Sequence, residues 1–329
     1  MTSNASTPDR SHVSTEKRNP RTMDLHTLGV KECVEAICRE DRHAFDAVRR
    51  ADHRITRFIE AIEPNFIAGG RLIYIGAGTS GRLGVLDASE SPPTFQIEHG
   101  RIIGIIAGGD ASLRTSSESR EDDPNGAHEE LAALNLTHAD AVLGIAAGGT
   151  TPYVLGALEF CKTKLPEAAR PITGLLCCTT VNPTPHIDHI ITLKTGAEVL
   201  TGSTRMKAGT ATKLTLNIIS TTLMIRLGKV YQNLMVDVKA TNSKLRDRAA
   251  RILITLTGLS RDECFALLDN ADGSVKTAAV MESRGVTKDE ALALLAAHQG
   301  RLDRILPEAD GKPPISQPLY PDQPEDSDE

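Results

Sequence analysis

The sequence predicts a three-layer α/β protein with a mostly parallel sheet flanked by helices, plus a small C-terminal all-helical subdomain. Two observations predict this fold class. Between residues 72 and 193, short apolar runs without polar alternation, typical of strands buried on both faces, are separated by helical stretches. Beyond about residue 230 the strand-like runs stop, and the pattern becomes wholly helical.

The elements follow in order along the chain. Between residues 31 and 68, apolar residues recur at three- and four-residue steps, which indicates helices before the first strand. Five buried strands are expected over residues 72–75, 102–107, 141–147, 172–178 and 190–193. A long helix is expected over residues 205–227, after Gly202-Ser203-Thr204.

Composition divides the chain into four parts. Residues 1–22 are rich in Ser and Thr and residues 307–329 in Pro and acids, so both are expected to be disordered tails that bury too little apolar surface to offset ordering entropy. Residues 23–248 are expected to form the main domain, with its core at about 62–228, and residues 249–306 a helical, UBA-like subdomain. This subdomain holds a repeat of period 27.

The two copies of the repeat cover residues 260–273 and 287–300. Each copy opens with the pattern of a capping box, in which a hydroxyl and a glutamate three residues later satisfy the first amides of a helix. The pairs are Ser260 with Glu263 and Thr287 with Glu290. A small helical bundle is therefore expected, with no chemistry of its own.

Composition also excludes several classes of function. Ten aromatic rings, none of them tryptophan, are too few for the stacking surfaces of single-stranded nucleic-acid binders. The net charge of -6 resides in residues 307–329, where seven acidic residues accompany one lysine, so the body of the chain is neutral. A neutral body has no electrostatic footprint for DNA or an anionic membrane, and neither is expected as a partner.

Cysteine and histidine spacing predicts neither a disulfide framework nor a metal site. The six cysteines form no CxxC pair. His186 and His189 form one H-x-x-H outside a helix, without a third ligand at a diagnostic spacing. The N-terminus lacks the apolar region of a signal peptide, and no apolar run approaches about 20 residues. A cytoplasmic protein with reduced thiols is expected.

Three turns of small residues each lead into an expected helix. The first has the pattern G-x-G-x-x-G at Gly76, Gly78 and Gly81. A dinucleotide site would need an acid about 20 residues on, but the next strand ends nearly 30 residues after Gly81. The hydroxyls of Thr79 and Ser80 at a helix N-terminus favour a compact phosphate instead.

The other two turns have the same character. Residues 146–152 contain Gly149, Thr150 and Thr151, and residues 201–207 contain Ser203, Thr204, Arg205 and Lys207. Cations in the first turn of a helix oppose its dipole, so Arg205 and Lys207 require an anionic partner. Each turn alone is compatible with an ordinary strand-to-helix connection. Together they predict one phosphate-lined crevice at the carboxyl edge of the sheet.

Several segments carry a resemblance to a known family. Residues 196–213, GAEVLTGSTRMKAGTATK, and residues 76–95, GAGTSGRLGVLDASESPPTF, resemble the N-acetylmuramic acid 6-phosphate etherases, which have the sugar-isomerase (SIS) fold. Glucokinase regulatory proteins share the motif at 196–213. The similarity runs from about residue 15 to residue 306, with EKRNPRTMD near the start and NLMVDVKATNSKL at 233–245.

The resemblance implies cleavage of the D-lactyl ether at C3 of an amino-sugar phosphate. In the open-chain sugar the C2 proton is α to the aldehyde and the ether oxygen is β to it, so elimination needs a base at C2 and an acid at the departing oxygen. Water then adds to the unsaturated aldehyde. Two carboxyl groups suffice for these steps, so no cofactor and no metal are expected.

Two glutamates match the catalytic pair of the family. Glu90 lies before Pro92 and Pro93, which are expected to end the helix that starts at the glycine turn. The negative end of that helix would favour the protonated form, so Glu90 is assigned as the acid toward lactate. Glu121 lies in a charge cluster typical of a wet helix face or loop, and it is assigned as the base at C2 only by resemblance.

Substrate-binding residues follow from the same match. The resemblance implies that the hydroxyls of the first and third turns bind the phosphate. It also implies that Arg205 or Lys207 binds the phosphate or the lactyl carboxylate. The implied binding residues in these two turns are Gly78, Thr79, Ser80, Gly81, Ser203, Thr204, Arg205 and Lys207. The second turn departs from the family pattern Ala-Ala-Ser-Gly-Arg-Thr-Pro, because Gly148 and Thr150 replace the serine and the arginine. Gly149, Thr150 and Thr151 remain as candidates there.

Two other functions share this sequence pattern. A regulatory relative binds sugar phosphates without catalysis, and an aldose-ketose isomerase abstracts the same α-proton without an acid at the C3 oxygen. Retention of both Glu90 and Glu121 favours the enzyme over the regulator. A homodimer is expected, by resemblance and because an α/β unit of this size often completes its crevice with a neighbour.

Overall fold

A computed structural model describes residues 10–115, 118–238 and 243–306. The chain divides into two compact units, Met1–Lys239 and Ala240–Glu329, which are described separately. Residues 1–9 of the expected N-terminal tail and the whole expected C-terminal tail, residues 307–329, lie outside the described residues.

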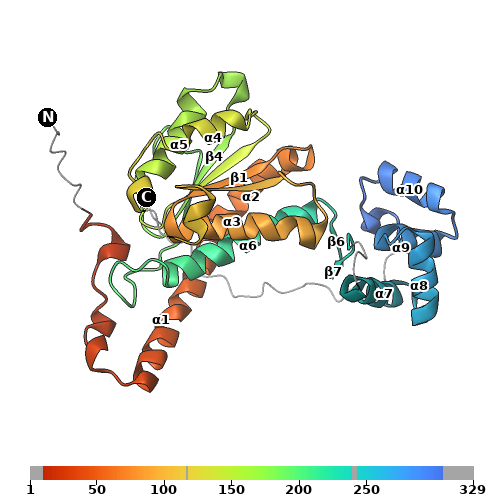
Figure 1. Cartoon of the computed structure of the whole chain (residues 1–329), viewed down its shortest axis with the longest axis horizontal. Helices are drawn as coiled ribbons and strands as arrows, with labels where there is room; N and C mark the ends of the chain where they lie inside the picture. Colours follow the sequence, from red (N-terminus) through yellow and green to blue (C-terminus); the bar gives the residue numbers. More distant parts are fainter. Residues whose placement is uncertain (1–9, 116–117, 239–242, 307–329) are drawn as a thin grey trace. The chain divides into compact units, whose positions relative to one another are not determined.

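The first unit contains a five-stranded parallel sheet in the order β2-β1-β3-β4-β5 (Figure 1). Its strands are β1 (Leu72–Gly76), β2 (Ile102–Ile106), β3 (Ala141–Ile145), β4 (Ile172–Cys177) and β5 (His189–Thr192). All four pairings are parallel, with Leu72 opposite both Ile102 and Ala141. The predicted strands and the parallel sheet are confirmed, with ends shifted by one or two residues.

Helices cover both faces of the sheet in two separate cores. They are α1 (Val30–Arg50), α2 (Asp52–Ile67), α3 (Gly78–Phe95), α4 (His128–Ala133), α5 (Pro152–Thr163) and α6 (Lys207–Arg226). Side chains of β1 alternate between the faces: Leu72 and Tyr74 pack with α1, α2, α3 and α6, whereas Ile73 and Ile75 pack with α4 and α5. This alternation produces the three layers that the apolar runs predicted.

Helix α3 passes through both of its prolines. The expected end near residue 90 is wrong, because the helix continues to Phe95 and closes at Gln96, whose φ is 50° and whose N–H donates to the carbonyl of Pro92. The φ of proline fits a helix, so the cost lies in the amide hydrogens that Pro92 and Pro93 lack and in the crowding of their rings against the preceding turn. Burial of Phe95 in the core accompanies the extra turn.

The N-terminal segment is ordered over residues 10–22, which corrects the predicted tail. It contains the short 3-10 helices Ser14–Glu16 and Pro20–Thr22, and Thr15 and Asn19 are buried. The prediction from composition failed here because the polar groups form hydrogen bonds with residues far away in the sequence. Thr22 Oγ1 donates to the carbonyl of Val199 at 2.8 Å, and Asn19 Nδ2 donates to Glu40 at 2.8 Å.

The second unit is helical, as predicted, with α7 (Ser243–Thr257), α8 (Arg261–Asn270), α9 (Val275–Arg284) and α10 (Lys288–Ala297). Residue 249 lies inside α7, so the predicted boundary between 248 and 249 is wrong. Helix α7 is one amphipathic element that buries Ala249 and Leu253 and packs on α8 and α9, so it belongs wholly to this unit.

The sequence repeat is also a structural repeat. Both capping boxes form, Ser260 with Glu263 and Thr287 with Glu290. The ends match as well: Gly273 N donates to the carbonyl of Leu268 at 2.8 Å, and Gly300 N donates to that of Leu295 at 2.7 Å. Helices α8 and α10 are therefore two copies of one capped helical turn pattern.

Candidate active site

The order of the strands reverses between β1 and β3, so the predicted crevice falls there. From β1 the chain crosses to β2 on one side and later returns to place β3 on the other side. In open parallel sheets, ligands bind outside the carboxyl ends of the strands at such a reversal. Helices α3 and α5 begin there, directly after the first and second turns.

The first turn packs so closely that it requires glycine. A Cβ on Gly81 would lie 2.7 Å from the carbonyl oxygen of Gly76, and Gly78 has a φ of +51°. Thr79 and Ser80 are half-buried in the first turn of α3. The amides of residues 78–80 have no partner within the helix, since Gly81 N is the first to donate to a helical carbonyl, that of Ala77. This turn offers amides and hydroxyls to an anion.

Glu121 lies between the first turns of two helices. Its Oε1 is 3.1 Å from the position that a Cβ would take on Gly78, at the start of α3. Its backbone carbonyl accepts a hydrogen bond from Tyr153 N, in the first turn of α5, at 3.0 Å. The structure therefore places the carboxyl group of Glu121 beside the first turn of α3, whose positive end favours a negative charge.

The second turn joins β3 to α5. Gly149 has a φ of +67°, and a Cβ there would lie 2.2 Å from Val181 Cγ1, so glycine is required on two grounds. Thr151 is the N-cap residue, and Pro152 is the first residue of α5, as the sequence predicts. Thr150 and Thr151 are half-buried beside the crevice.

Helix α6, which follows the third turn, lies against the first turn. A Cβ on Gly209 would be 3.5 Å from Thr79 Cγ2 and 3.4 Å from the carbonyl oxygen of Thr204. The amides of Ser203 and Thr204 donate to the carbonyls of Leu200 and Gly202, so this turn offers side-chain hydroxyls. The structure thus places the first turn beside the start of α6, two residues after the third turn.

Lys207 is placed differently from the expectation. Its side chain is fully buried, and Nζ lies 2.8 Å from Oε2 of Glu40. The anionic partner that the sequence demanded is therefore a carboxylate of the protein itself. Arg205 is exposed and remains at the surface of the third turn. Sequence reasoning missed Glu40, because nothing in a helical pattern marks an interior carboxylate 167 residues from its partner.

Glu90 is not brought to Glu121 within one chain. It is exposed on α3, twelve residues after Gly78, over which Glu121 lies. Twelve residues of helix rise by about 18 Å. One turn earlier, the buried Asp87 accepts hydrogen bonds from Tyr74 Oη at 3.0 Å and Asn217 Nδ2 at 2.8 Å. These bonds fix the inner face of α3 and leave Glu90 on its outer face.

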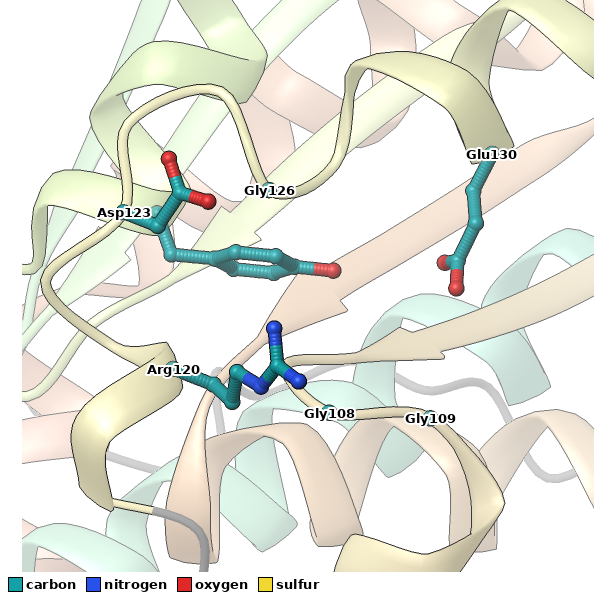
Figure 2. Close-up of a pocket in the computed structure, with 7 residues that line it drawn as sticks. Gly108, Gly109, Arg120, Asp123, Gly126 and Glu130 are labelled. Carbon is teal, nitrogen blue, oxygen red and sulfur yellow. The ribbon is translucent and has the colours of Figure 1, made fainter.

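A cavity of about 300 Å³ lies at the carboxyl end of β2, beside Arg120, the residue before Glu121. Its lining residues are Gly108, Gly109, Arg120, Asp123, Gly126, Glu130 and Tyr153. Arg120, Asp123 and Glu130 approach it from different sides (Figure 2). Burial raises the pKa of Glu130, with a smaller contribution from Asp110, and burial raises that of Tyr153. None of these seven residues was predicted from the sequence.

Among the described residues, no group of three or more His, Cys, Asp or Glu side chains is arranged to hold a metal ion. No helix in the same ranges is both long and apolar enough to cross a membrane.

Comparison with known proteins gives consistent matches. The family model "Glucokinase regulatory protein N-terminal SIS domain" matches residues 54–162. A phosphoheptose isomerase from Francisella tularensis has 14% identity and a TM-score of 0.42, over 60% of this chain and 98% of that one.

Two relatives named N-acetylmuramic acid 6-phosphate etherase match much more of the sequence. That of Caldanaerobacter subterraneus is 47% identical over 87% of this chain and 92% of its own. That of Gloeobacter violaceus is 48% identical over 93% of this chain and 98% of its own. At this identity and coverage, the chain belongs to the N-acetylmuramic acid 6-phosphate etherase family.

Proposed function

We propose that this chain cleaves the D-lactyl ether of N-acetylmuramic acid 6-phosphate, giving N-acetylglucosamine 6-phosphate and D-lactate in the recycling of cell-wall amino sugars. The observation that carries the proposal is 47–48% identity to etherases over about nine-tenths of the chain. The crevice at the β1–β3 reversal, with Glu121 between two helix N-termini, supports it.

The phosphate is proposed to bind between the first and third turns. Thr79 and Ser80 supply hydroxyls and amides at the positive end of α3, and Ser203 and Thr204 supply hydroxyls from the adjacent third turn. Gly148 and Thr150 stand where the family pattern has serine and arginine, so the hydroxyls of Thr150 and Thr151 are the proposed substitutes in the second turn. Arg205 is the proposed partner of the lactyl carboxylate, because the ammonium of Lys207 is already paired inside the protein.

Glu121 is proposed as the base that removes the C2 proton. Its position above Gly78 supports the carboxylate form, which a base requires. Glu90 is proposed as the acid that protonates the departing lactate oxygen. In one chain it lies about 18 Å along α3 from Gly78, so it reaches the site of Glu121 only from a second copy.

The outer face of α3 and α6 is the proposed contact with that second copy. The two helices pack side by side (Figure 1), and Leu86, Ile218 and Ile225 on them are 50%, 40% and 47% exposed. Leu86 and Ile218 adjoin Asp87 and Asn217, which bond the two helices together. Glu90 follows Leu86 by one turn, on the same face. A homodimer formed there would cover the apolar side chains and carry Glu90 to its partner.

A cytoplasmic location is part of the proposal. All six cysteines are unpaired. Three of them, Cys161, Cys177 and Cys178, are buried in the core, and burial raises the pKa of each thiol. Reduced thiols are typical of a reducing compartment.

The products of the reaction test the proposal. Incubation with synthetic N-acetylmuramic acid 6-phosphate is expected to release D-lactate, measured with D-lactate dehydrogenase. An aldose-ketose isomerase would form a ketose from an aldose phosphate and release no lactate. A regulatory protein would bind the sugar phosphate and change nothing. Either of these two results would refute the etherase assignment.

Gly156→Ala is expected to disturb the position of Glu121. Gly156 lies on α5, where a Cβ would be 1.9 Å from the carbonyl oxygen of Pro124, three residues after Glu121. Relief of this backbone clash must move the 121–124 segment, so we expect about tenfold or greater loss of kcat/KM and about 1–3 kcal/mol of destabilisation. Steady-state kinetics and thermal melts measure the two effects.

Gly29→Ala is the matched control for that change. Its φ is -72°, and the nearest atom to a Cβ there is 3.5 Å away. It should leave kcat/KM unchanged. Equal kinetics in Gly156→Ala and wild type would show that the segment carrying Glu121 does not need its contact with α5.

A further inference from the structure

Three charged side chains are buried together at the start of α6. Glu40, Lys207 and Glu198 are each at most 1% exposed. A buried charge is costly unless it is paired and hydrogen-bonded. The partners of these three groups therefore show which elements they hold together.

Glu40, on α1, joins two other segments. Its Oε2 accepts hydrogen bonds from Lys207 Nζ and Asn19 Nδ2, both at 2.8 Å, and Arg21 donates to both carboxylate oxygens. The hydrogen bond from Arg21 is the main cause that holds the pKa of Glu40 well below its usual range. One carboxylate thus connects α1, the N-terminal segment and the first residue of α6.

Glu198 fixes the same end of α6 from the segment just before the third turn. Its two oxygens accept from the amides of Lys207 at 2.9 Å and Ala208 at 2.8 Å. These amides are therefore not offered to a ligand. Burial raises the pKa of Glu198, although both amides act in the other direction. Ser203 and Thr204 lie between Glu198 and Lys207, so both ends of the third turn are tied to this cluster.

The N-terminal strap, residues 13–22, follows the carboxyl edge of the sheet. Val13 Cγ1 lies 3.6 Å from the position of a Cβ on Gly148, in the second turn. Ser14 N donates to Thr179 Oγ1, beyond β4, at 3.3 Å. At the third turn, Glu16 Oε2 lies 3.1 Å from the position of a Cβ on Gly202. The strap thus contacts two of the three turns before Asn19 and Arg21 reach Glu40.

We propose that Glu40 is a positioning residue of the sugar-phosphate site. By holding Lys207 and the strap, it sets Ser203 and Thr204 at the distance from Thr79 and Ser80 at which all four hydroxyls reach one phosphate. Lys207 acts in the same way and does not touch the substrate. The inference rests on the proposed function and deepens it. It adds a residue outside the sequence motifs that positions the phosphate-binding hydroxyls.

Three variants of the full chain test the proposal. Arg21→Met removes one tie through a side chain that is 52% exposed, so the variant is expected to fold. Glu40→Gln/Lys207→Met removes both charges of the buried pair at once, so neither of the two is left buried without the other. We expect both variants to raise the KM for N-acetylmuramic acid 6-phosphate, by about tenfold up to about 100-fold, with a smaller change in kcat.

Asp140→Asn is the matched control. Asp140 is 2% exposed and pairs with Arg71 at 2.7 Å, at the amino ends of β1 and β3, remote from the crevice. It should lower the melting temperature without changing KM. Unchanged KM in Arg21→Met and in the double variant would overturn the proposal. An equal rise of KM in Asp140→Asn would overturn it too, because any loss of stability would then suffice.

Calorimetric binding of N-acetylglucosamine 6-phosphate separates this inference from the proposed function. A wild-type chain that binds this ligand but releases no D-lactate refutes the etherase assignment alone. The same variants then decide the role of Glu40 by their dissociation constants. Weaker binding in Arg21→Met and in the double variant supports the positioning role, and wild-type binding in both refutes it.

Discussion

Glu121→Gln is expected to lower the rate of D-lactate release by about 10²–10⁴-fold, the usual contribution of a positioned acid or base. The amide has the shape of the carboxylate but cannot accept the C2 proton. The backbone contact of residue 121 with Tyr153 N does not involve the side chain and should persist. We therefore expect an unchanged fold, checked by thermal melting, together with a loss confined to turnover. Glu90→Gln should behave in the same way.

Asp122→Asn provides the control for a charge effect. Asp122 is the exposed neighbour of Glu121, so its substitution removes the same charge from the same segment. It should leave turnover near that of wild type. Turnover near wild type in Glu121→Gln would remove this residue from the mechanism, whereas equal losses in both variants would indicate that the charge of the segment matters and that proton transfer by Glu121 does not.

Local sequence patterns predicted the sheet and the turns that lead into α3 and α5. Continuous apolar runs identify strands that are buried on both faces. Parallel strands end at the same edge of a sheet, so the turns that follow them lie at one edge. Gly78 and Gly149 were accessible to this reasoning, because a positive φ demands glycine at fixed places in a turn.

Pairings between distant segments were not accessible. The partners of Lys207 and Asp87 are Glu40 and Asn217, which lie 167 and 130 residues away and carry no periodic mark. The order of residues 10–22 depends on the same long-range bonds, so composition alone predicted a tail there. The continuation of α3 beyond Pro92 was not predicted, because the low helix propensity of proline is a local property. The packing of Phe95 in the core depends on distant residues.

Mixing the two inactive variants should restore activity if the site is shared between subunits. In a heterodimer of Glu90→Gln and Glu121→Gln, one site receives both substitutions, and the other receives an intact Glu90 from one chain and an intact Glu121 from its partner. Random reassociation gives about half heterodimers, each with one working site, so about a quarter of wild-type activity is expected. D-lactate release after denaturation and joint refolding measures it.

The gain on mixing is decisive because the two geometries predict opposite results. If Glu90 acted on the substrate of its own chain, every site in every mixture would lack one glutamate, and activity would stay at the level of the single variants. The length of α3 between Gly78 and Glu90, about 18 Å, argues against that arrangement. Leu86→Glu offers an independent check, because a charge on the exposed apolar face should dissociate the dimer and abolish turnover together.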